Sequence, residues 1–262
     1  MDLSLQGKRA LVCGSSAGIG KASAQELALL GAEVYLVARS ADKLQAAVAA
    51  LPAEHGQQHA YITADFDRTE SIEAALQPLL DQGLQFHILV NNTGGPPAGP
   101  AHKAGLDEYL TAFRRHLLAN QTLAQLLIPG MRAGGYGRII NVISTSVKAP
   151  LPNLGVSNTI RGAVANWSKT LSRELGPDGI TVNNVLPGAT ETERLSSIIG
   201  NKAAKTGASE AEVAQEMKAE VPLNRFAQPH EVAAALAFLA SPAAAYISGI
   251  NVPVDGGRTP NL

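Results

Sequence analysis

The sequence predicts an α/β domain built around a parallel sheet that is buried on both faces. Short runs rich in Val, Ile and Leu alternate along the chain with longer amphipathic stretches, and this alternation is typical of strand–helix–strand units. Of the 262 residues, 45% are hydrophobic and only 16% are charged, which provides enough apolar surface for a sizeable core. Because α/β folds of this length commonly remain undivided, residues 1–262 are expected to form a single domain.

Seven of the apolar runs are short enough to be strands. They are Ala10–Cys13, Glu33–Val37, His59–Thr63, His87–Asn91, Arg138–Ile143, Thr181–Leu186 and Asn251–Val254. The amphipathic stretches between them are expected as helices, several after a Ser, Thr or Asp cap. They are Ile19–Leu30, Asp42–Leu51, Ser71–Leu80, Leu106–Met131, Ser157–Leu175 and Glu231–Leu239. Helices on both faces of one parallel sheet make a doubly wound fold.

Two segments interrupt this alternation. Residues 94–100, with the sequence GGPPAGP, are expected as a loop because proline removes backbone donors and glycine leaves the backbone loosely specified. Residues 190–220 form a polar, helix-prone insertion before the last helix. Open α/β folds often carry a substrate lid there, so we interpret the insertion as a lid or, alternatively, as an ordinary surface excursion.

Charge and composition narrow the class of partner. The formal net charge is -1, so we expect no basic surface for nucleic acid. No segment reaches the roughly 18 apolar residues of a membrane helix, and the first residues lack the regions of a secretion signal. We therefore expect a cytoplasmic protein without membrane contact. Cys13 is the only cysteine, which argues against an internal disulfide or a metal site.

A glycine-rich turn follows the first expected strand. Its glycines have the spacing G-x-x-x-G-x-G, and a helix is expected directly after them. Glycines let the backbone turn tightly and approach a pyrophosphate, whose charge meets free N–H groups and the positive end of the helix. The position between strand and helix indicates a dinucleotide site rather than a plain connector. The expected contacts are Gly14, Ser15, Ser16, Gly18, Ile19 and Gly20.

The end of the second expected strand indicates which dinucleotide is bound. An Asp or Glu there would accept hydrogen bonds from a free ribose 2′-hydroxyl. This chain has Ala38 followed by Arg39 and Ser40. The guanidinium fork suits a phosphate and the hydroxyl adds a donor, so NADP(H) is favoured over NAD(H). The alternative is that Arg39 is a solvated surface residue.

Three further motifs follow the expected strands: Asp65 after the third, Asn91-Asn92-Thr93-Gly94 after the fourth, and Pro187-Gly188-Ala189-Thr190-Glu191-Thr192 after the sixth. With the glycine turn, they resemble the short-chain dehydrogenase/reductase family over essentially the whole chain, and most of all its 3-oxoacyl-[acyl-carrier-protein] reductases. The resemblance implies a Rossmann domain assembled as a homotetramer, with adenine near Asp65 and nicotinamide near Asn91 and Thr192. The other contacts it implies are Thr93, Gly94, Pro187, Gly188 and Thr190.

The catalytic residues of that family are only partly present. In the family a tyrosine donates a proton while the nicotinamide donates hydride, a lysine four residues later lowers the pKa of the tyrosine, and a serine and an asparagine complete the site. Counting without gaps places Ser144 at the serine position. It places Ser157 at the tyrosine, Arg161 at the lysine and His116 at the asparagine position. Three of the four positions therefore differ.

The substituted residues are the candidates for an altered proton path. Ser157 is a far weaker acid than a phenol, and Arg161 stays protonated, so we expect Arg161 to bind the cofactor. The imidazole of His116 would titrate near neutrality and pass a proton through water toward Ser144 or Ser157. The alternative is a structural histidine. Lys148 is interpreted either as a pocket cation or as an exposed residue.

Two functions follow from this pattern. The first is an NADP(H)-dependent oxidoreductase that acts on a small-molecule carbonyl or alcohol through a non-standard proton path, and the resemblance favours it. The second is an NADP(H)-binding protein with impaired catalysis and a sensor or assembly role, which loss of the tyrosine and lysine would produce. Neither the 94–100 loop nor the insertion has a charge pattern that names the substrate.

Overall fold

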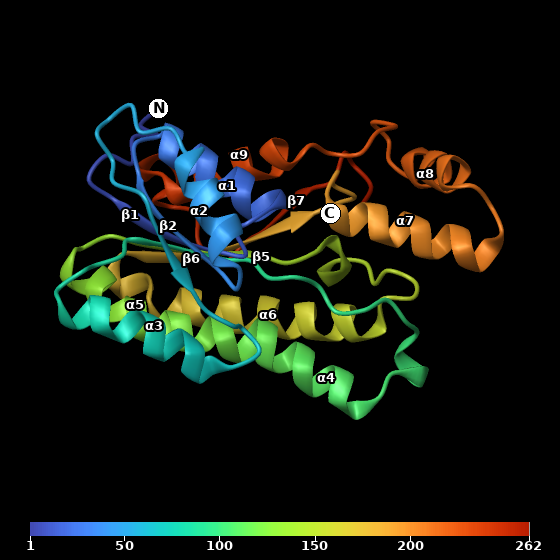
Figure 1. The fold of residues 1–262 in the computed structure, drawn as a ribbon, viewed down its shortest axis with the longest axis horizontal. Helices are drawn as coiled ribbons and strands as arrows, with labels where there is room; N and C mark the ends of the chain where they lie inside the picture. Colours follow the sequence, from blue (N-terminus) through green and yellow to red (C-terminus); the bar gives the residue numbers. More distant parts are fainter. Residues whose placement is uncertain (262) are drawn as a thin grey trace.

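A computed structural model describes residues 1–261 of the protein. Its strands form one parallel sheet in the order β3-β2-β1-β4-β5-β6-β7 (Figure 1). The strands are β1 (Arg9–Cys13), β2 (Glu33–Ala38), β3 (Ala60–Thr63), β4 (Ile88–Asn91), β5 (Gly137–Val142), β6 (Ile180–Pro187) and β7 (Asn251–Val254). The α/β fold class predicted from the sequence is confirmed. The strand order reverses between β1 and β4, which is where such folds bind ligands, at the carboxyl ends of the strands.

Helices cover both faces of the sheet (Figure 1). One face carries α1 (Gly18–Leu29), α2 (Ala41–Ala49) and α9 (Pro229–Ala240). The other face carries α3 (Thr69–Asp81), α5 (Ala119–Ala133) and α6 (Gly155–Glu174). Strand β1 shows how each face is built, because Ala10 and Val12 pack into the first layer while Leu11 and Cys13 pack into the second. Both faces are therefore dry, and β1 is an unbroken apolar run.

The helix expected over Leu106–Met131 is wrong in one respect. The structure has α4 (Leu106–Phe113), a π-helical turn over Arg114–Leu118 and then α5. The apolar pattern continues across the turn, so its periodicity does not reveal the additional residue that the turn accommodates. The turn places His116 in the interior, with 2% of its surface exposed.

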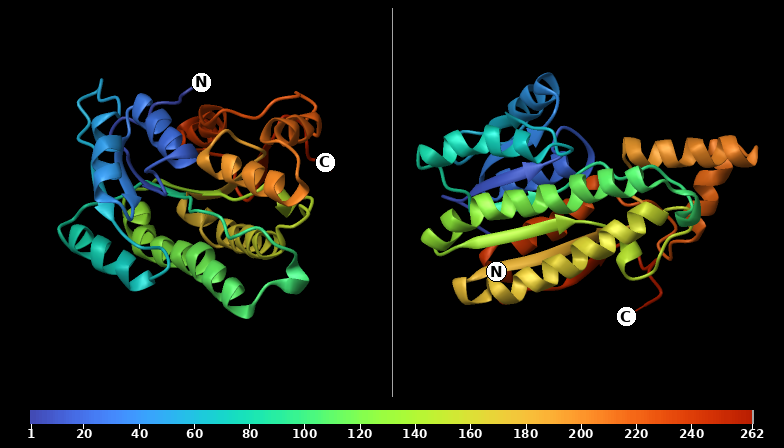
Figure 2. Two further views of the ribbon diagram at one scale, coloured as in Figure 1. Left: turned by 45° about the vertical axis from the view of Figure 1, so that its right-hand side comes forward. Right: turned by 90° about the horizontal axis from the view of Figure 1, so that it is seen from below.

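The insertion at residues 190–220 forms two helices, α7 (Glu193–Thr206) and α8 (Glu210–Ala219). Thr192 caps α7 by accepting from Leu195 N, and Ser209 and Glu212 form a capping box on α8. The two helices project from one end of the molecule (Figure 2). No helix in the described part of the chain is long and apolar enough to span a membrane.

Candidate active site

The glycine turn has a shape that side chains would destroy. Gly14 and Gly18 have positive φ angles of 57° and 54°. A Cβ on Gly14 would lie 2.5 Å from the carbonyl oxygen of Asn92, and one on Gly20 would lie 2.3 Å from the carbonyl oxygen of Gly14. Ala17 precedes α1 and makes no side-chain cap hydrogen bond. The first N–H groups of α1 therefore lack a side-chain acceptor, as a pyrophosphate site requires.

Two polar side chains hold this turn in place. The amide of Asn92 donates to the carbonyl oxygens of Cys13 at 3.3 Å and Gly14 at 3.2 Å. The hydroxyl of Ser15 accepts from Val37 N at 3.0 Å and is fully buried. The Ser15 side chain therefore faces β2, and the expected cofactor contact of Ser15 stays a prediction. Asn92 was missed as a site residue, although the Asn-Asn pair after β4 was the available signal.

The carboxyl end of β2 presents Arg39 and Ser40, both exposed. The Ser40 hydroxyl caps α2 by accepting from Lys43 N at 3.5 Å. The nearby Asp67 carboxylate forms a two-point ion pair with Arg115, with both oxygens at 2.6 Å. This pair holds the pKa of Asp67 below its usual value. The positive charge of Arg39 also contributes to lowering the pKa of Asp67.

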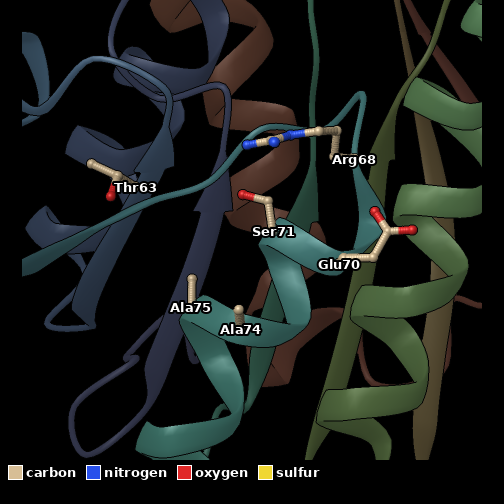
Figure 3. Close-up of a pocket in the computed structure, with 6 residues that line it drawn as sticks. All are labelled: Thr63, Arg68, Glu70, Ser71, Ala74 and Ala75. Carbon is tan, nitrogen blue, oxygen red and sulfur yellow. The ribbon is translucent and has the colours of Figure 1, made fainter.

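The loop after β3 lies next to this end of the sheet. Asp65 is half-buried, accepts from Asp67 N at 3.1 Å, and its own backbone N donates to Ser71 Oγ at 3.0 Å. Beside it is a surface hollow of about 470 Å³ (Figure 3), lined by Thr63, Arg68, Glu70, Ser71, Ala74 and Ala75. Strands β2, β1 and β4 separate β3 from β5. The hollow is therefore remote from the catalytic positions that follow β5.

Asn91 belongs to a ladder of amides that crosses the sheet. Its Nδ2 donates to Asn141 Oδ1 at 2.8 Å, Asn141 donates to Asn184 at 2.9 Å, and Asn184 donates to Asn251 at 2.8 Å. These residues are in register on β4, β5, β6 and β7. With 2% of Asn91 exposed, its side chain serves the ladder, and the expected location of nicotinamide near Asn91 stays a prediction. The ladder instead fixes the strand ends from which the site is built.

Two catalytic candidates lie on α6 and one lies after β5. Ser144 is half-buried and its hydroxyl accepts from Ser146 N at 3.1 Å. Ser157, also half-buried, is in the first turn of α6. Arg161 is 8% exposed and donates from Nη1 to the carbonyl oxygen of Val142 at 2.9 Å, which ties α6 to the end of β5. Burial, followed by repulsion from Arg194, lowers the pKa of Arg161 to about 10, so it remains a cation near neutral pH.

His116 lies on the π-helical turn with its ring inside the protein. Its Nδ1 is hydrogen-bonded to Thr93 Oγ1 at 2.7 Å, and its Nε2 has no partner. Burial, followed by repulsion from Arg161, Arg115 and Arg194, lowers the pKa of His116 to about 2. The expectation that this imidazole titrates near neutrality is therefore wrong, because desolvation removes the charged form. The structure brings Thr93 and His116 together as a neutral pair.

Several of the remaining expected residues lie between β6 and the start of α7. Gly188 packs closely on β7, since a Cβ there would lie 2.8 Å from Asp255 Cα. Thr190 is buried and bonds within its own turn, while Thr192 lies 3.3 Å from a Cβ built on Gly18. The others are Ser16, Ile19, Pro187 and Lys148, which are half-buried, and Gly94, which is exposed. Sequence reasoning missed Arg194, which donates from Nη2 to the carbonyl oxygen of Pro96 at 2.6 Å.

Comparison with known proteins places this geometry in a family. The chain matches the family described as Enoyl-(Acyl carrier protein) reductase over residues 14–259. It is 35% identical over 257 residues to the 3-oxoacyl-[acyl-carrier-protein] reductase FabG of Vibrio cholerae, covering 97% of this chain and 98% of that protein. The chain belongs to the short-chain dehydrogenase/reductase family. The family predicted from the sequence motifs is thus confirmed.

Solved structures of the family share the whole fold of this short-chain dehydrogenase/reductase. L-sorbose reductase from Gluconobacter frateurii, complexed with NADPH and L-sorbose, superposes with a TM-score of 0.93 at 33% identity, covering 100% of both chains. YwfH, an NADPH-dependent reductase involved in bacilysin biosynthesis, superposes with a TM-score of 0.91 at 26% identity, covering 97% of this chain and 99% of that one. The fold is thus shared with reductases whose descriptions name NADPH.

Proposed function

We propose that this protein is an NADP(H)-dependent reductase of small carbonyl compounds. The observation that carries the proposal is the uncapped N-terminus of α1 inside the Gly14–Gly20 turn, with Arg39 exposed at the end of the neighbouring strand. The helix terminus supports pyrophosphate binding, and the guanidinium supports binding of a 2′-phosphate. When bound, NADPH supplies the hydride. The relatives that are named as NADPH-dependent reductases support the same assignment.

The residues of this chain would act on the substrate carbonyl as follows. The guanidinium of Arg161 stays cationic, and its bond to Val142 holds it at the end of β5, where it would stabilise negative charge on the bound substrate. The hydroxyls of Ser144 and Ser157 donate hydrogen bonds to the carbonyl oxygen. Because both are aliphatic alcohols, the proton consumed in the reaction comes from water. The neutral His116 holds the hydroxyl of Thr93 in place.

A second candidate is an NADP(H)-binding protein with impaired catalysis that acts as a sensor or in assembly. One observation favours it: neither His116, with a pKa of about 2, nor Arg161, with a pKa of about 10, can serve as an acid near neutrality. A positioned general acid typically contributes about 10²- to 10⁴-fold in rate. Without one, reduction would be slow unless the substrate carbonyl is activated.

We also propose the setting in which the protein works. It acts in the cytoplasm, where NADPH favours reduction over oxidation, and residues 190–220 serve as a substrate lid. Helix α4 leaves Leu106, Leu110 and Phe113 exposed along one face, and this spacing supports a subunit contact within a homotetramer. Light scattering during size-exclusion chromatography measures the molar mass of the assembly. The L110K variant is expected to have a smaller molar mass than the homotetramer. A monomer in the unmodified protein would contradict it.

The test of the proposed function is NADPH oxidation, followed by absorbance, against β-ketoacyl thioesters, diketones, quinones and sugars. A parallel fluorescence titration measures NADPH binding. Turnover of at least one class with NADPH, and a markedly lower rate with NADH, is the expected result. Tight NADPH binding without turnover across the panel would favour the sensor instead.

A further inference from the structure

Two cationic arginines and the neutral His116, from three separate elements, lie around the loop after β4 and the end of β5. Arg161 comes from α6, Arg194 from the first turn of α7, and His116 from the π-helical turn. The Arg194 side chain reaches the loop after β4, where a Cβ on Gly95 would lie 3.4 Å from its Nη2. His116 binds Thr93 and Arg194 binds Pro96, so the two side chains hold the same short stretch of that loop.

The two guanidinium groups lack anionic partners. Within residues 1–261, neither Arg161 nor Arg194 forms an ion pair with a carboxylate. Arg115 on the π-helical turn differs, because Asp67 neutralises it. Arg161 and Arg194 each donate to one backbone carbonyl oxygen, and a carbonyl dipole does not cancel a full charge. A guanidinium has five N–H donors, so most of theirs remain available.

Burying the charge of Arg161 without an anionic partner destabilises the folded protein. Arg161 is 8% exposed, and its Nε is buried with no hydrogen-bond partner. The Nε2 of His116 is also buried without a partner. Buried charges in proteins are ordinarily paired, but here a second cation, Arg194, lies near the first and repels it. Proteins concentrate one sign of charge in a cleft when the ligand carries the other sign.

We propose that the substrate carries an oxyanion group, a carboxylate or a phosphate, which binds between Arg161 and Arg194. Arg161 forms the interior end of this site, and the exposed Arg194 forms its rim beside the 94–100 loop. This inference rests on the proposed reductase function and names its substrate class. It also agrees with the lid proposed for residues 190–220, because Arg194 would connect α7 to the bound anion.

The binding test uses the protein saturated with NADP⁺ and a probe that cannot be reduced. Malonate and inorganic phosphate are titrated separately by calorimetry. Tighter binding of malonate would indicate a carboxylate site, and tighter binding of phosphate would indicate a phosphate site. R194Q is expected to weaken binding of the preferred probe at least tenfold, while R194K retains most of the affinity. R173Q is the matched control, because Arg173 is an exposed arginine in the last turn of the same α6 helix that carries Arg161.

The kinetic test compares carbonyl compounds that differ only in charge, such as oxo acids and their methyl esters. The free acids are expected to have a kcat/KM at least tenfold above the esters, and R194Q is expected to narrow that ratio mainly through KM. If Arg194 only tethered α7 to Pro96, R194Q would instead lower thermal stability and would change kcat/KM equally for the acids and the esters. R194K would then fail to restore the ratio.

Three results would overturn the inference: no probe binding by the NADP⁺ complex, equal turnover of acids and esters, or an R194Q loss of NADPH affinity equal to the loss of probe affinity. The last would assign Arg194 to the cofactor phosphates. Probe binding without any turnover would uphold the anion site while contradicting the reductase. Turnover of esters and acids alike would uphold the reductase while contradicting the anion site.

Discussion

The buried polar side chains in the two halves of the sheet differ in whether their hydrogen bonds are satisfied. Around β1 and β2, Ser15 and Asn92 bond to backbone groups and lock the glycine turn. Around the ends of β4 and β5, Asn91 Oδ1, His116 Nε2 and Arg161 Nε are buried without partners, and among the described residues every such side-chain atom lies at position 91 or later. Buried polar atoms are normally satisfied. The polar side chains around the glycine turn are therefore satisfied within the protein, whereas those of Asn91, His116 and Arg161 each keep a buried atom without a partner.

The double variant S157Y/R161K should produce the largest change. It supplies a phenol acid with a cation four residues later on α6, and a general acid is typically worth about 10²- to 10⁴-fold in rate. Turnover of a β-ketoacyl thioester with NADPH is the measurement, with R161K alone as the control. No gain in rate, with NADPH binding intact, would show that the site around the ends of β4 and β5 has been rebuilt rather than merely depleted of its acid.

G20A should abolish most cofactor binding. Its Cβ would lie 2.3 Å from the carbonyl oxygen of Gly14, so the turn must shift away from the phosphate position. We expect NADPH affinity to fall about 100-fold, with a loss of about 1–3 kcal/mol in unfolding free energy from overpacking. G176A is the matched control, since a Cβ there meets nothing within 4 Å. Unchanged NADPH titration would contradict the role of the turn.

R39D should reverse the cofactor preference. It removes a charge-assisted contact with the 2′-phosphate, worth about 1.5–3 kcal/mol, and adds repulsion. The ratio of NADPH to NADH affinity is expected to fall by about 10- to 100-fold. R173D changes another exposed arginine and should leave the ratio as it was. If both variants behave alike, Arg39 is only a solvated surface residue.

His116 should make the folded protein sensitive to mild acid. The pKa of His116 is about 2 in the folded protein and near 6.5 in the unfolded chain. At a pH between these two pKa values, the unfolded chain binds one more proton than the folded protein. Stability is therefore full above about pH 6.5 and falls as the pH decreases, by about 1.4 kcal/mol from pH 7.5 to pH 5.5. Urea unfolding at a series of pH values measures this loss of stability. In H116N, the free energy of unfolding should no longer fall by this amount between pH 7.5 and pH 5.5.

The fold could be predicted from the sequence because the apolar runs and the glycine spacing are both local patterns. Apolar runs bounded by turn residues predict the strands, and the spacing of Gly14, Gly18 and Gly20 predicts the tight turn before α1. Helix ends differ by one or two residues, as expected where terminal turns fray. The π-helical turn at Arg114–Leu118 was not predicted, since the apolar pattern is the same with or without it.

The chemistry of the site was less predictable because it depends on burial. The identity of His116 suggested a titrating group, but its depth in the protein and the neighbouring arginines keep it neutral. Ser15 and Asn91 belong to the expected cofactor motifs, yet their side chains face β2 and Asn141. Arg194 stands in an insertion without a motif, and only the folded chain brings it to Pro96.

The most direct test of the account is calorimetric titration of the unmodified protein with NADPH and with NADH. The glycine turn and the exposed Arg39 predict that NADPH binds at least tenfold more tightly, whether or not any substrate is turned over. Equal affinities, or no binding of either dinucleotide, would contradict the account.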